Sequence, residues 1–272
     1  MLTIIDTTSL YISVSHHCNK NENDDFKIYK DTLDEWFQTI LDETKATEYL
    51  AFDDDKPSFR HLLFPDFKDD RKRAYFKFVN DIRHYAKEKW SIRSFKGLES
   101  DDLFSMSNSI HKDKEIVLAH IDGDLDQIEG KHYNYHYRSK NWSNGFYEIT
   151  SETASLNLSN SILAGSHNNN KGLDGCGEKS SEKYLTNLST KGVLNAFING
   201  INKEEYGIYK SIKGLGMTIG IEEFRKNVLM SKLLTNIDEA NYWLSKVNLP
   251  LVTNDMFIHI KIQTKDNGIT NW

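Results

Sequence analysis

Residues 116–124 read Ile-Val-Leu-Ala-His-Ile-Asp-Gly-Asp, a short apolar run that ends in two carboxylates. Three other short apolar runs end in the same way, at Asp6, at Asp53 and at the cluster 99–102. Buried strands of a parallel sheet are short apolar runs, and functional groups in an open α/β sheet collect where the strands end. The pattern therefore predicts an α/β fold with carboxylates along one edge of its central sheet.

Seven carboxylates follow these four runs, and they would repel one another unless divalent cations lay among them. They are Asp6, Asp53, Glu99, Asp101, Asp102, Asp122 and Asp124. Ligand sets made only of carboxylate oxygens suit Mg²⁺ or Mn²⁺ rather than zinc, and no His/Cys set in the sequence competes with them. The pattern predicts a Mg²⁺- or Mn²⁺-dependent enzyme.

The composition is that of a soluble globular protein. With 272 residues the chain can form one large domain or two that share a cleft, and 27% charged and 12% aromatic residues are ordinary values. The apolar stretches are far shorter than the roughly 20 residues needed to span a bilayer. The N-terminus lacks the features of a signal peptide. Cys18 and Cys176 match no zinc or CxxC spacing, so we expect free thiols in a reducing cytoplasm, that of a bacterium or a phage-infected host cell.

The charge of the chain is unevenly distributed. The whole chain has a net charge of −6, yet residues 56–96 hold twelve Lys or Arg against five acids, a net charge of +7. Nine aromatic residues lie within the same segment. Segregation of this kind indicates a polyanion-binding element beside an acidic site, although a solvated basic helix would show the same charges.

Strands and helices are predicted to alternate through the first half of the chain. The expected strands cover residues 3–6, 49–53 and 116–121, and the expected helices cover 31–45, 66–90, 98–110 and a start at 124–128. The alternation of aromatic and polar residues over 132–150 predicts a hairpin, and a further strand is expected within 256–263. The Gly-rich segment 172–180 leads into a helix, an arrangement that favours binding of a phosphate.

Five motifs in a fixed order carry a resemblance to a known family. They are Phe-Asp-Asp-Asp-Lys-Pro-Ser-Phe-Arg-His at 52–61, Phe-Pro-Asp-Phe-Lys-Asp-Asp-Arg-Lys at 64–72, Gly-Leu-Glu-Ser-Asp-Asp at 97–102, Asp-Gly-Asp-Leu-Asp-Gln-Ile at 122–128 and Gly-Leu-Asp-Gly-Cys-Gly-Glu-Lys at 172–179. In this order, over about residues 3–190, the chain resembles the 5′-nuclease superfamily of flap endonucleases and 5′→3′ exonucleases. It is most similar to the phage-type enzymes and to the nuclease domain of bacterial DNA polymerase I.

The resemblance implies a fold and a division of the chain. The fold is a PIN-like 5′-nuclease core, in which helices flank a central, mostly parallel, twisted sheet. Residues 1–150 would form this catalytic core, with a helical arch at about 66–96. Residues 151–272 would form a helix–three-turn–helix that grips duplex DNA, followed by a C-terminal region.

The resemblance also implies roles for the carboxylates. Asp6, Asp53, Glu99 and Asp101 would bind a first metal ion, with Asp102 close by. Asp122 and Asp124 would face a second ion, with Asp101 between the two. The reaction would be hydrolysis of a phosphodiester bond, in which metal-bound water attacks in line.

Basic and aromatic residues of the same motifs would contact nucleic acid. Lys68 and Arg71 match the family's basic pair and would steer and stabilise the scissile phosphate, while Phe67 would stack on a base or belong to the core. The other expected contacts are Arg60, Lys72, Arg73, Gly175, Gly177 and Lys179. Arg60 could equally be an ion-pair partner of neighbouring carboxylates, and the Gly-rich turn could bind K⁺.

A fifth cluster departs from the family pattern. Where the family has Gly-Asp-x-x-Asp-Asn, this chain reads Gly-Ser-His-Asn-Asn-Asn at 165–170, so both carboxylates are replaced by neutral groups. The second metal site should therefore be weak.

The function expected from the resemblance is a structure-selective 5′ nuclease that acts on flaps, nicks or branched duplexes, including RNA–DNA. We expect a monomer with no membrane association, and a polymerase or single-strand-binding protein as a natural partner. The alternatives are a catalytically inactive homologue that binds branched DNA, and an α/β protein with clustered acids and no DNA partner.

Overall fold

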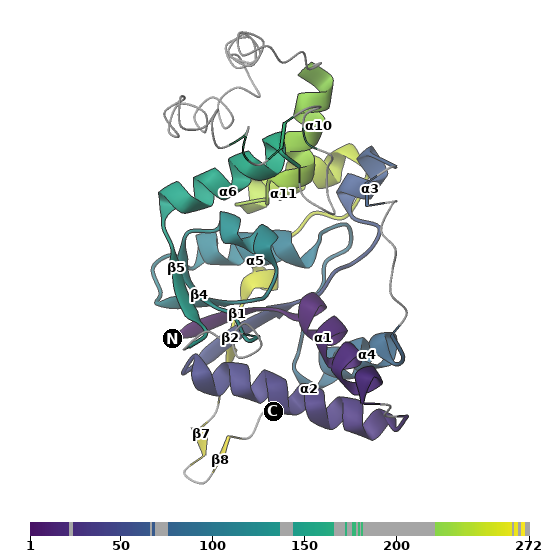
Figure 1. Cartoon of the computed structure of the whole chain (residues 1–272), viewed down its shortest axis with the longest axis vertical. Helices are drawn as coiled ribbons and strands as arrows, with labels where there is room; N and C mark the ends of the chain where they lie inside the picture. The colour runs from purple at the N-terminus through teal and green to yellow at the C-terminus, as the bar shows by residue number, and fades with distance from the viewer. Residues whose placement is uncertain are drawn as a thin grey trace.

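The computed structural model describes most of the chain (Figure 1). The described residues are 1–21, 24–65, 67–68, 76–136, 144–165, 172, 176–177, 179, 181, 221–262, 264–265 and 268–269. The fifth cluster at 166–170 and the segment 182–220 lie outside them.

Strands and helices alternate through the first half of the described chain. The strands are β1 (Leu2–Asp6), β2 (Glu48–Phe52), β3 (Ile116–Ala119), β4 (Gly130–Tyr133), β5 (Phe146–Ile149), β6 (Ile260–Lys261), β7 (Thr264–Lys265) and β8 (Gly268–Ile269). The helices are α1 (Thr7–Lys20), α2 (Phe26–Glu43), α3 (Phe59–Leu63), α4 (Val79–Lys89), α5 (Ser100–Ile110), α6 (Ser151–Leu163), α10 (Ile221–Ser231) and α11 (Ile237–Lys246). The described residues also form two 3₁₀ turns, η1 (Gly123–Gln127) and η3 (Asn254–Phe257).

Six strands form the central sheet in the order β5-β4-β3-β1-β2-β6. Strand β1 lies in the middle and pairs in parallel with β2 and β3, so Ile4 lies opposite both Leu50 and Leu118. Strand β4 is parallel to β3, whereas β5 and β6 run antiparallel at the two edges. The carboxyl ends of β1, β2 and β3 therefore lie at the same edge of the sheet, as the strand-end carboxylates predicted.

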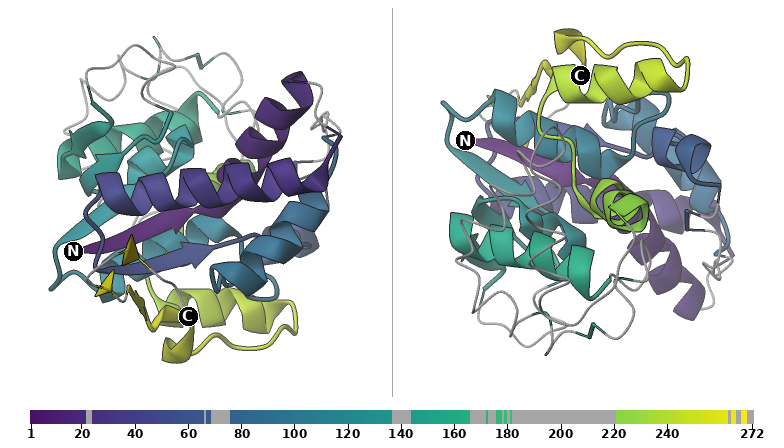
Figure 2. Two further views of the ribbon diagram at one scale, coloured as in Figure 1. Left: turned by 90° about the horizontal axis from the view of Figure 1, so that it is seen from below. Right: turned by 90° about the horizontal axis from the view of Figure 1, so that it is seen from above.

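Helices cover both faces of this sheet (Figure 2). Successive side chains of a strand point to opposite faces. Accordingly Ile5 of β1 packs in the core under α1, α2 and α4, while its neighbour Ile4 packs in the second core under α5 and α11. Every residue of β1 is buried. Continuous burial explains why this strand reads as an unbroken apolar run rather than as an alternating pattern.

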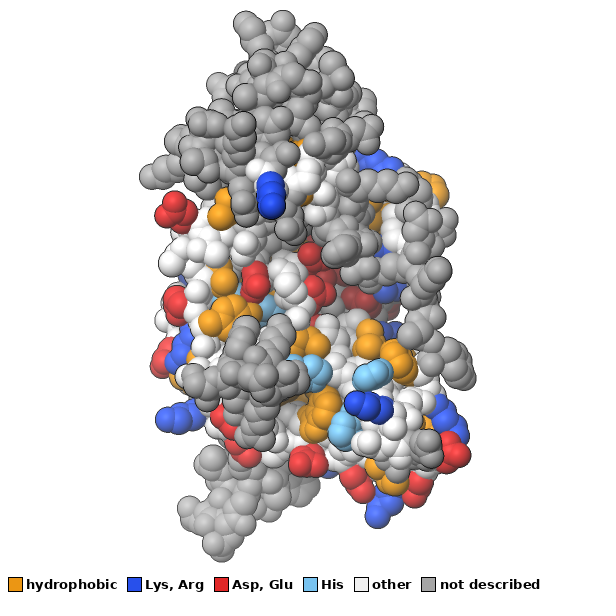
Figure 3. All heavy atoms as spheres, in the orientation of Figure 1, with side chains coloured by type: hydrophobic (Ala, Val, Ile, Leu, Met, Phe, Trp, Pro, Cys, Tyr) orange, Lys and Arg blue, Asp and Glu red, His pale blue; other side chains and the backbone are white. Residues whose placement is uncertain are grey.

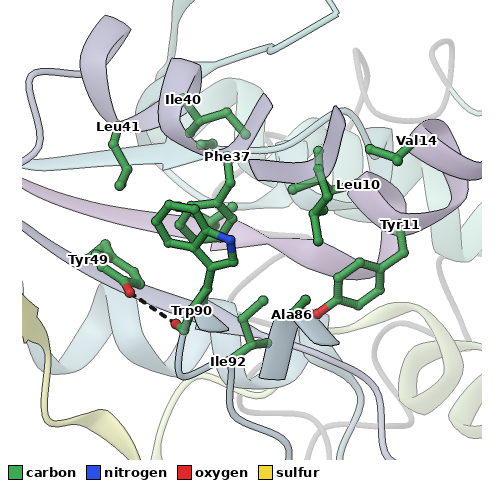
Figure 4. Packing of buried hydrophobic residues seen from close by; sticks show 14 of the residues in the cluster. Leu10, Tyr11, Val14, Phe37, Ile40, Leu41, Tyr49, Ala86, Trp90 and Ile92 are labelled. Atoms are coloured by element: carbon green, nitrogen blue, oxygen red, sulfur yellow. Dashed lines mark hydrogen bonds between the residues drawn. The ribbon is translucent and has the colours of Figure 1, made fainter. Parts of the chain in front are cut away.

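An aromatic cluster ties α4 to the sheet (Figure 4). Trp90 follows the last residue of α4 and stacks on Phe37 of α2, with ring centroids 4.3 Å apart. The Tyr49 hydroxyl on β2 donates to the Trp90 carbonyl oxygen at 3.0 Å, and the indole Nε1 donates to Asp34 at 2.7 Å. Buried aromatic pairs of this kind contribute about 0.5–1.5 kcal/mol beyond the area they bury. The cluster holds the C-terminal end of α4, and with it the basic residues of that helix.

The predicted fold class is confirmed, with differences in detail. The sheet is mixed but mostly parallel, and the hairpin expected at 132–150 is the antiparallel pair β4–β5. The helix expected over 66–90 begins at Val79 in the described chain, and the start expected at 124–128 is the short turn η1. None of the described helices is long and apolar enough to cross a membrane. The division near residue 150 stays a prediction, although β6 pairs with β2 in the same sheet.

Candidate active site

Asp6 is placed by the junction between β1 and α1. It is 1% exposed and is the N-cap of α1, with its Oδ1 accepting the Thr8 N–H at 3.1 Å. Its other oxygen, Oδ2, is buried and has no hydrogen-bond partner in the described part of the chain. Burial raises the pKa of Asp6 to about 7, and the charges of Asp122 and Asp54 add to this effect against a hydrogen bond from Ser9. A cation bound beside Asp6 would stabilise the charged form of its carboxylate.

The first turn of α5 brings a second carboxylate to the same place. Ser100 donates to Asp54 Oδ1 from its backbone N–H at 2.9 Å and from its hydroxyl at 3.0 Å. The Thr8 hydroxyl donates to that of Ser100 at 3.2 Å, so α1 and α5 are joined across the edge of the sheet. Beside this link, burial and the charges of Asp122 and Asp6 raise the pKa of Asp101 well above its usual range.

Asp122 follows β3 and completes the group. Its Oδ1 accepts the Asp124 N–H at 2.9 Å, and its charge acts on both Asp6 and Asp101. We call Asp6, Asp54, Asp101 and Asp122 the acid cluster. Space-filling spheres show carboxylates gathered in a recess near the middle of one face, with Lys or Arg side chains beside them (Figure 3).

The acid cluster fits a divalent cation. Its donors are all carboxylate oxygens, the ligands that Mg²⁺ and Mn²⁺ prefer. Two of its members, Asp6 and Asp101, have raised pKa values because burial and mutual repulsion disfavour their charged forms. A cation would relieve both costs, and the unpartnered Asp6 Oδ2 is an available ligand atom. Asp6, Asp54, Asp101 and Asp122 are the residues that could hold it.

Asp54 was missed by sequence reasoning, which had chosen its neighbour Asp53. The Asp53 carboxylate forms ion pairs with two side chains of α4, Arg83 at 3.1 Å and Lys87 at 3.0 Å. Its link to the site within the described part of the chain is the Thr8 hydroxyl at 3.4 Å. Burial alone would raise the pKa of Asp54, but Lys56 and the Ser100 N–H lower it to about 2. The run of three aspartates at 53–55 was the available signal, because neighbours in extended chain face opposite ways.

Arg60 is an ion-pair partner of neighbouring carboxylates and does not make the expected contact with DNA. Its guanidinium is 2% exposed and binds both oxygens of Asp102, at 2.5 and 2.8 Å. It also donates to Glu99 at 3.3 Å and to the Leu229 and Lys232 carbonyls at 2.8 Å each. A side chain enclosed in this way cannot reach a phosphate, so the predicted nucleic-acid contact is corrected. Asp102, fully buried, is used as the partner of Arg60.

Lys68 lies beside the acid cluster, while Phe67 turns inward. The Lys68 ammonium binds Glu99 at 2.5 Å and is among the charges that act on Asp101. Phe67 is 2% exposed and packs edge-on against His61, with centroids 4.9 Å apart. Stacking of Phe67 on a base is therefore corrected to the core alternative.

The structure describes only some of the remaining expected residues. Asp124 is half-buried and supplies its backbone N–H to Asp122. Gly177 and Lys179 are exposed. Arg71, Lys72, Arg73 and Gly175 lie outside the described residues. Their predicted contacts, and K⁺ binding by the Gly-rich turn, stay predictions.

Known proteins of similar shape were found among solved structures. The bacteriophage T5 5′-exonuclease with bound zinc covers 91% of this chain and 98% of its own, with a TM-score of 0.64 and 16% identity. A bacteriophage T5 flap endonuclease in complex with DNA and metal ions covers 90% of this chain and 91% of its own, with a TM-score of 0.61 and 18% identity. The described chain therefore has a 5′-nuclease fold.

Sequence comparison agrees with the fold. A curated 5′-3′ exonuclease of Mycoplasmopsis pulmonis (strain UAB CTIP) is 27% identical over 176 residues, which cover 60% of this chain and 59% of that protein. No protein-family model matches the chain. The resemblance to the 5′-nuclease superfamily is thus confirmed, on a fold whose acid cluster lies at the carboxyl edge of its sheet.

Proposed function

We propose that this protein is a metal-dependent 5′ nuclease that hydrolyses phosphodiester bonds in flapped, nicked or branched DNA or RNA–DNA. The observation that carries the proposal is the acid cluster, four carboxylates at one sheet edge with an unpartnered buried oxygen on Asp6. The 5′-nuclease fold and the distant exonuclease relative support it.

The chain's own residues suggest how each part would act. Asp6, Asp54, Asp101 and Asp122 would hold the divalent cation, which when bound supplies an activated water and neutralises charge on the phosphate. Lys56 pairs with Asp54 of this group at 3.0 Å, and Lys68 binds Glu99 beside it. Lys68 would exchange Glu99 for the scissile phosphate and stabilise its developing charge. Glu99 keeps Arg60 as a partner if Lys68 leaves.

Helix α4 would present the substrate with a basic surface. Arg83 and Lys87 lie on its inner side against Asp53, and each is about one-third exposed. Contacts from such residues go to the backbone and do not read sequence, which suits selection by DNA structure. Binding should weaken as salt rises, because each neutralised phosphate releases condensed counterions.

Cleavage of a 5′-flap duplex with Mg²⁺ or Mn²⁺ tests the proposal. Asp101→Asn should lower the cleavage rate at least about 100-fold, the scale for losing a group that stabilises transition-state charge. Asp113→Asn is the matched control, because Asp113 is exposed and precedes β3 at the opposite edge of the sheet. Absence of cleavage by the wild-type chain, or equal rates in Asp101→Asn, would refute the enzyme assignment.

A non-catalytic binder of branched DNA is the second candidate. The neutral Gly-Ser-His-Asn-Asn-Asn segment at 165–170 favours it, because amides and hydroxyls ligate Mg²⁺ poorly. The same assay separates the two. Salt-dependent binding of the flap duplex without cleavage, in either metal, supports the binder.

A further inference from the structure

A second polar cluster is joined to Asp122 of the acid cluster through a hydrogen bond of His120, and it has a different chemistry. His120 follows β3, His132 belongs to β4, and Asp126 lies on η1 between them. One ligand atom from each of the three lies within 4.8 Å of the others. Both imidazoles are buried, at 1% and 0% exposure. Folding brings these three residues together from positions spaced six apart in the sequence, and the expectation that no His/Cys set competes for metal stays a prediction.

The hydrogen bonds of the two rings fix where their protons lie. His120 Nδ1 is 2.8 Å from the Asp122 carbonyl oxygen, and His132 Nε2 is 2.8 Å from the Ile128 carbonyl oxygen. A carbonyl oxygen can only accept, so each of these nitrogens carries the hydrogen. In the neutral rings the opposite nitrogens, His120 Nε2 and His132 Nδ1, are then both acceptors. They face each other at 2.6 Å.

Two lone pairs at that distance repel unless a cation lies between them. A shared proton and a metal ion both meet this requirement, and the neutral imidazole is the commonest metal ligand in proteins. The hydrogen bonds of the two rings to backbone carbonyls also fit a metal site. Imidazoles that bind metals typically donate their other N–H to a backbone carbonyl or carboxylate.

Asp126 supplies a third donor and a route from solvent. Its Oδ1 is 3.9 Å from His120 Nε2, and its side chain is 31% exposed. The Tyr147 hydroxyl on β5 donates to the same oxygen at 2.9 Å and lies 3.3 Å from His120 Nε2. Two nitrogens and one carboxylate oxygen are a ligand set that suits zinc and its neighbours rather than Mg²⁺.

We propose that His120, His132 and Asp126 bind one transition-metal ion of the zinc class, at a site separate from the acid cluster. In a tetrahedral zinc site, bonds of about 2.0–2.1 Å place two nitrogens roughly 3.3 Å apart, so the rings separate slightly on binding. Since His120 also holds the Asp122 carbonyl, the bound ion steadies the loop that carries Asp122.

Titration of the full chain with Co²⁺ in a large excess of Mg²⁺ tests the site. Mg²⁺ occupies the carboxylates but not the imidazoles, so one equivalent of Co²⁺ should bind with visible absorption typical of nitrogen ligands. His132→Gln and Asp126→Asn should each weaken Co²⁺ binding at least about tenfold. Asp126 is partly exposed, so its variant keeps the test decisive if His132→Gln fails to fold.

Two controls separate this site from others. His84→Gln should leave Co²⁺ affinity unchanged, because His84 is 79% exposed on α4. Asp101→Asn alters the acid cluster and should also leave it unchanged. A pair bridged only by a proton would bind no Co²⁺ under these conditions, and that result overturns the proposal. Equal affinity in wild type, His132→Gln and Asp126→Asn overturns it as well.

Discussion

Replacing Arg60 with methionine should destabilise the protein strongly, because Arg60 is the buried partner of Asp102. Arg60 makes five hydrogen bonds, of which two bind Asp102 and one binds Glu99. Asp102 has no exposed surface, so the substitution leaves its charge buried with the Leu234 N–H as a remaining donor. Removing one partner of a buried ion pair costs about 3–5 kcal/mol.

Urea unfolding at pH 7 measures this cost. For a slope near 3 kcal/mol per molar urea, the transition midpoint of Arg60→Met should fall by about 1–2 M. Lys27→Met is the matched control, since its pair with Asp31 is 4.0 Å long and both side chains are more than 60% exposed. That variant should change stability by less than about 0.5 kcal/mol.

A double variant distinguishes an ion pair from loss of packing. Arg60→Met with Asp102→Leu removes the uncompensated charge, so it should be less destabilised than the sum of the single variants by about 2 kcal/mol or more. If Arg60→Met costs under about 1 kcal/mol and instead abolishes duplex binding, the buried role is refuted and Arg60 contacts DNA.

Two further predictions concern a metal ligand and pH. Asp54→Asn should weaken Mn²⁺ binding, measured by calorimetry, at least about tenfold, while Asp55→Asn next to it should not; equal effects would remove Asp54 from the acid cluster. Glu48 has a pKa below its usual 4.5, mainly through the hydrogen bond from Lys114, so its stabilisation is present above pH 4.5 and disappears as pH falls through the folded pKa. Glu48→Gln should therefore cost about 1 kcal/mol of unfolding free energy at pH 7 and progressively less as the pH falls below 4.5. A pH-independent cost would contradict the ion pair.

The strands were predictable because burial leaves a simple trace in sequence. In β1, β2 and β3 both faces of the sheet are covered by helices, so each strand reads as a short apolar run. The polar residue that ends each run marks the carboxyl edge. The position of Asp6, Asp53 and Asp122 at one edge follows from parallel pairing of β1, β2 and β3, whereas Asp101 is brought there by α5.

Assignment of individual side chains was less predictable. Asp53 and Asp54 are adjacent and chemically identical, and which of them faces the acid cluster depends on Ser100 from α5 and on Arg83 and Lys87 from α4. Those partners lie about 30 to 50 residues away in sequence. Arg60 could likewise be predicted either to contact DNA or to pair with carboxylates. The structure decides for the ion pair, because Arg60 also donates to the carbonyls of Leu229 on α10 and of Lys232 just after it.

The sequence by itself determined an α/β sheet, its order of strand-end carboxylates and the preference of those oxygens for Mg²⁺ or Mn²⁺. Short-range pattern is sufficient for this, because burial and strand periodicity act within a few residues. Only the tertiary structure decided which carboxylates meet, which are neutralised by Arg60, Lys68 and α4, and that His120, His132 and Asp126 converge. Such choices depend on distances between residues remote in the chain, which no local pattern records.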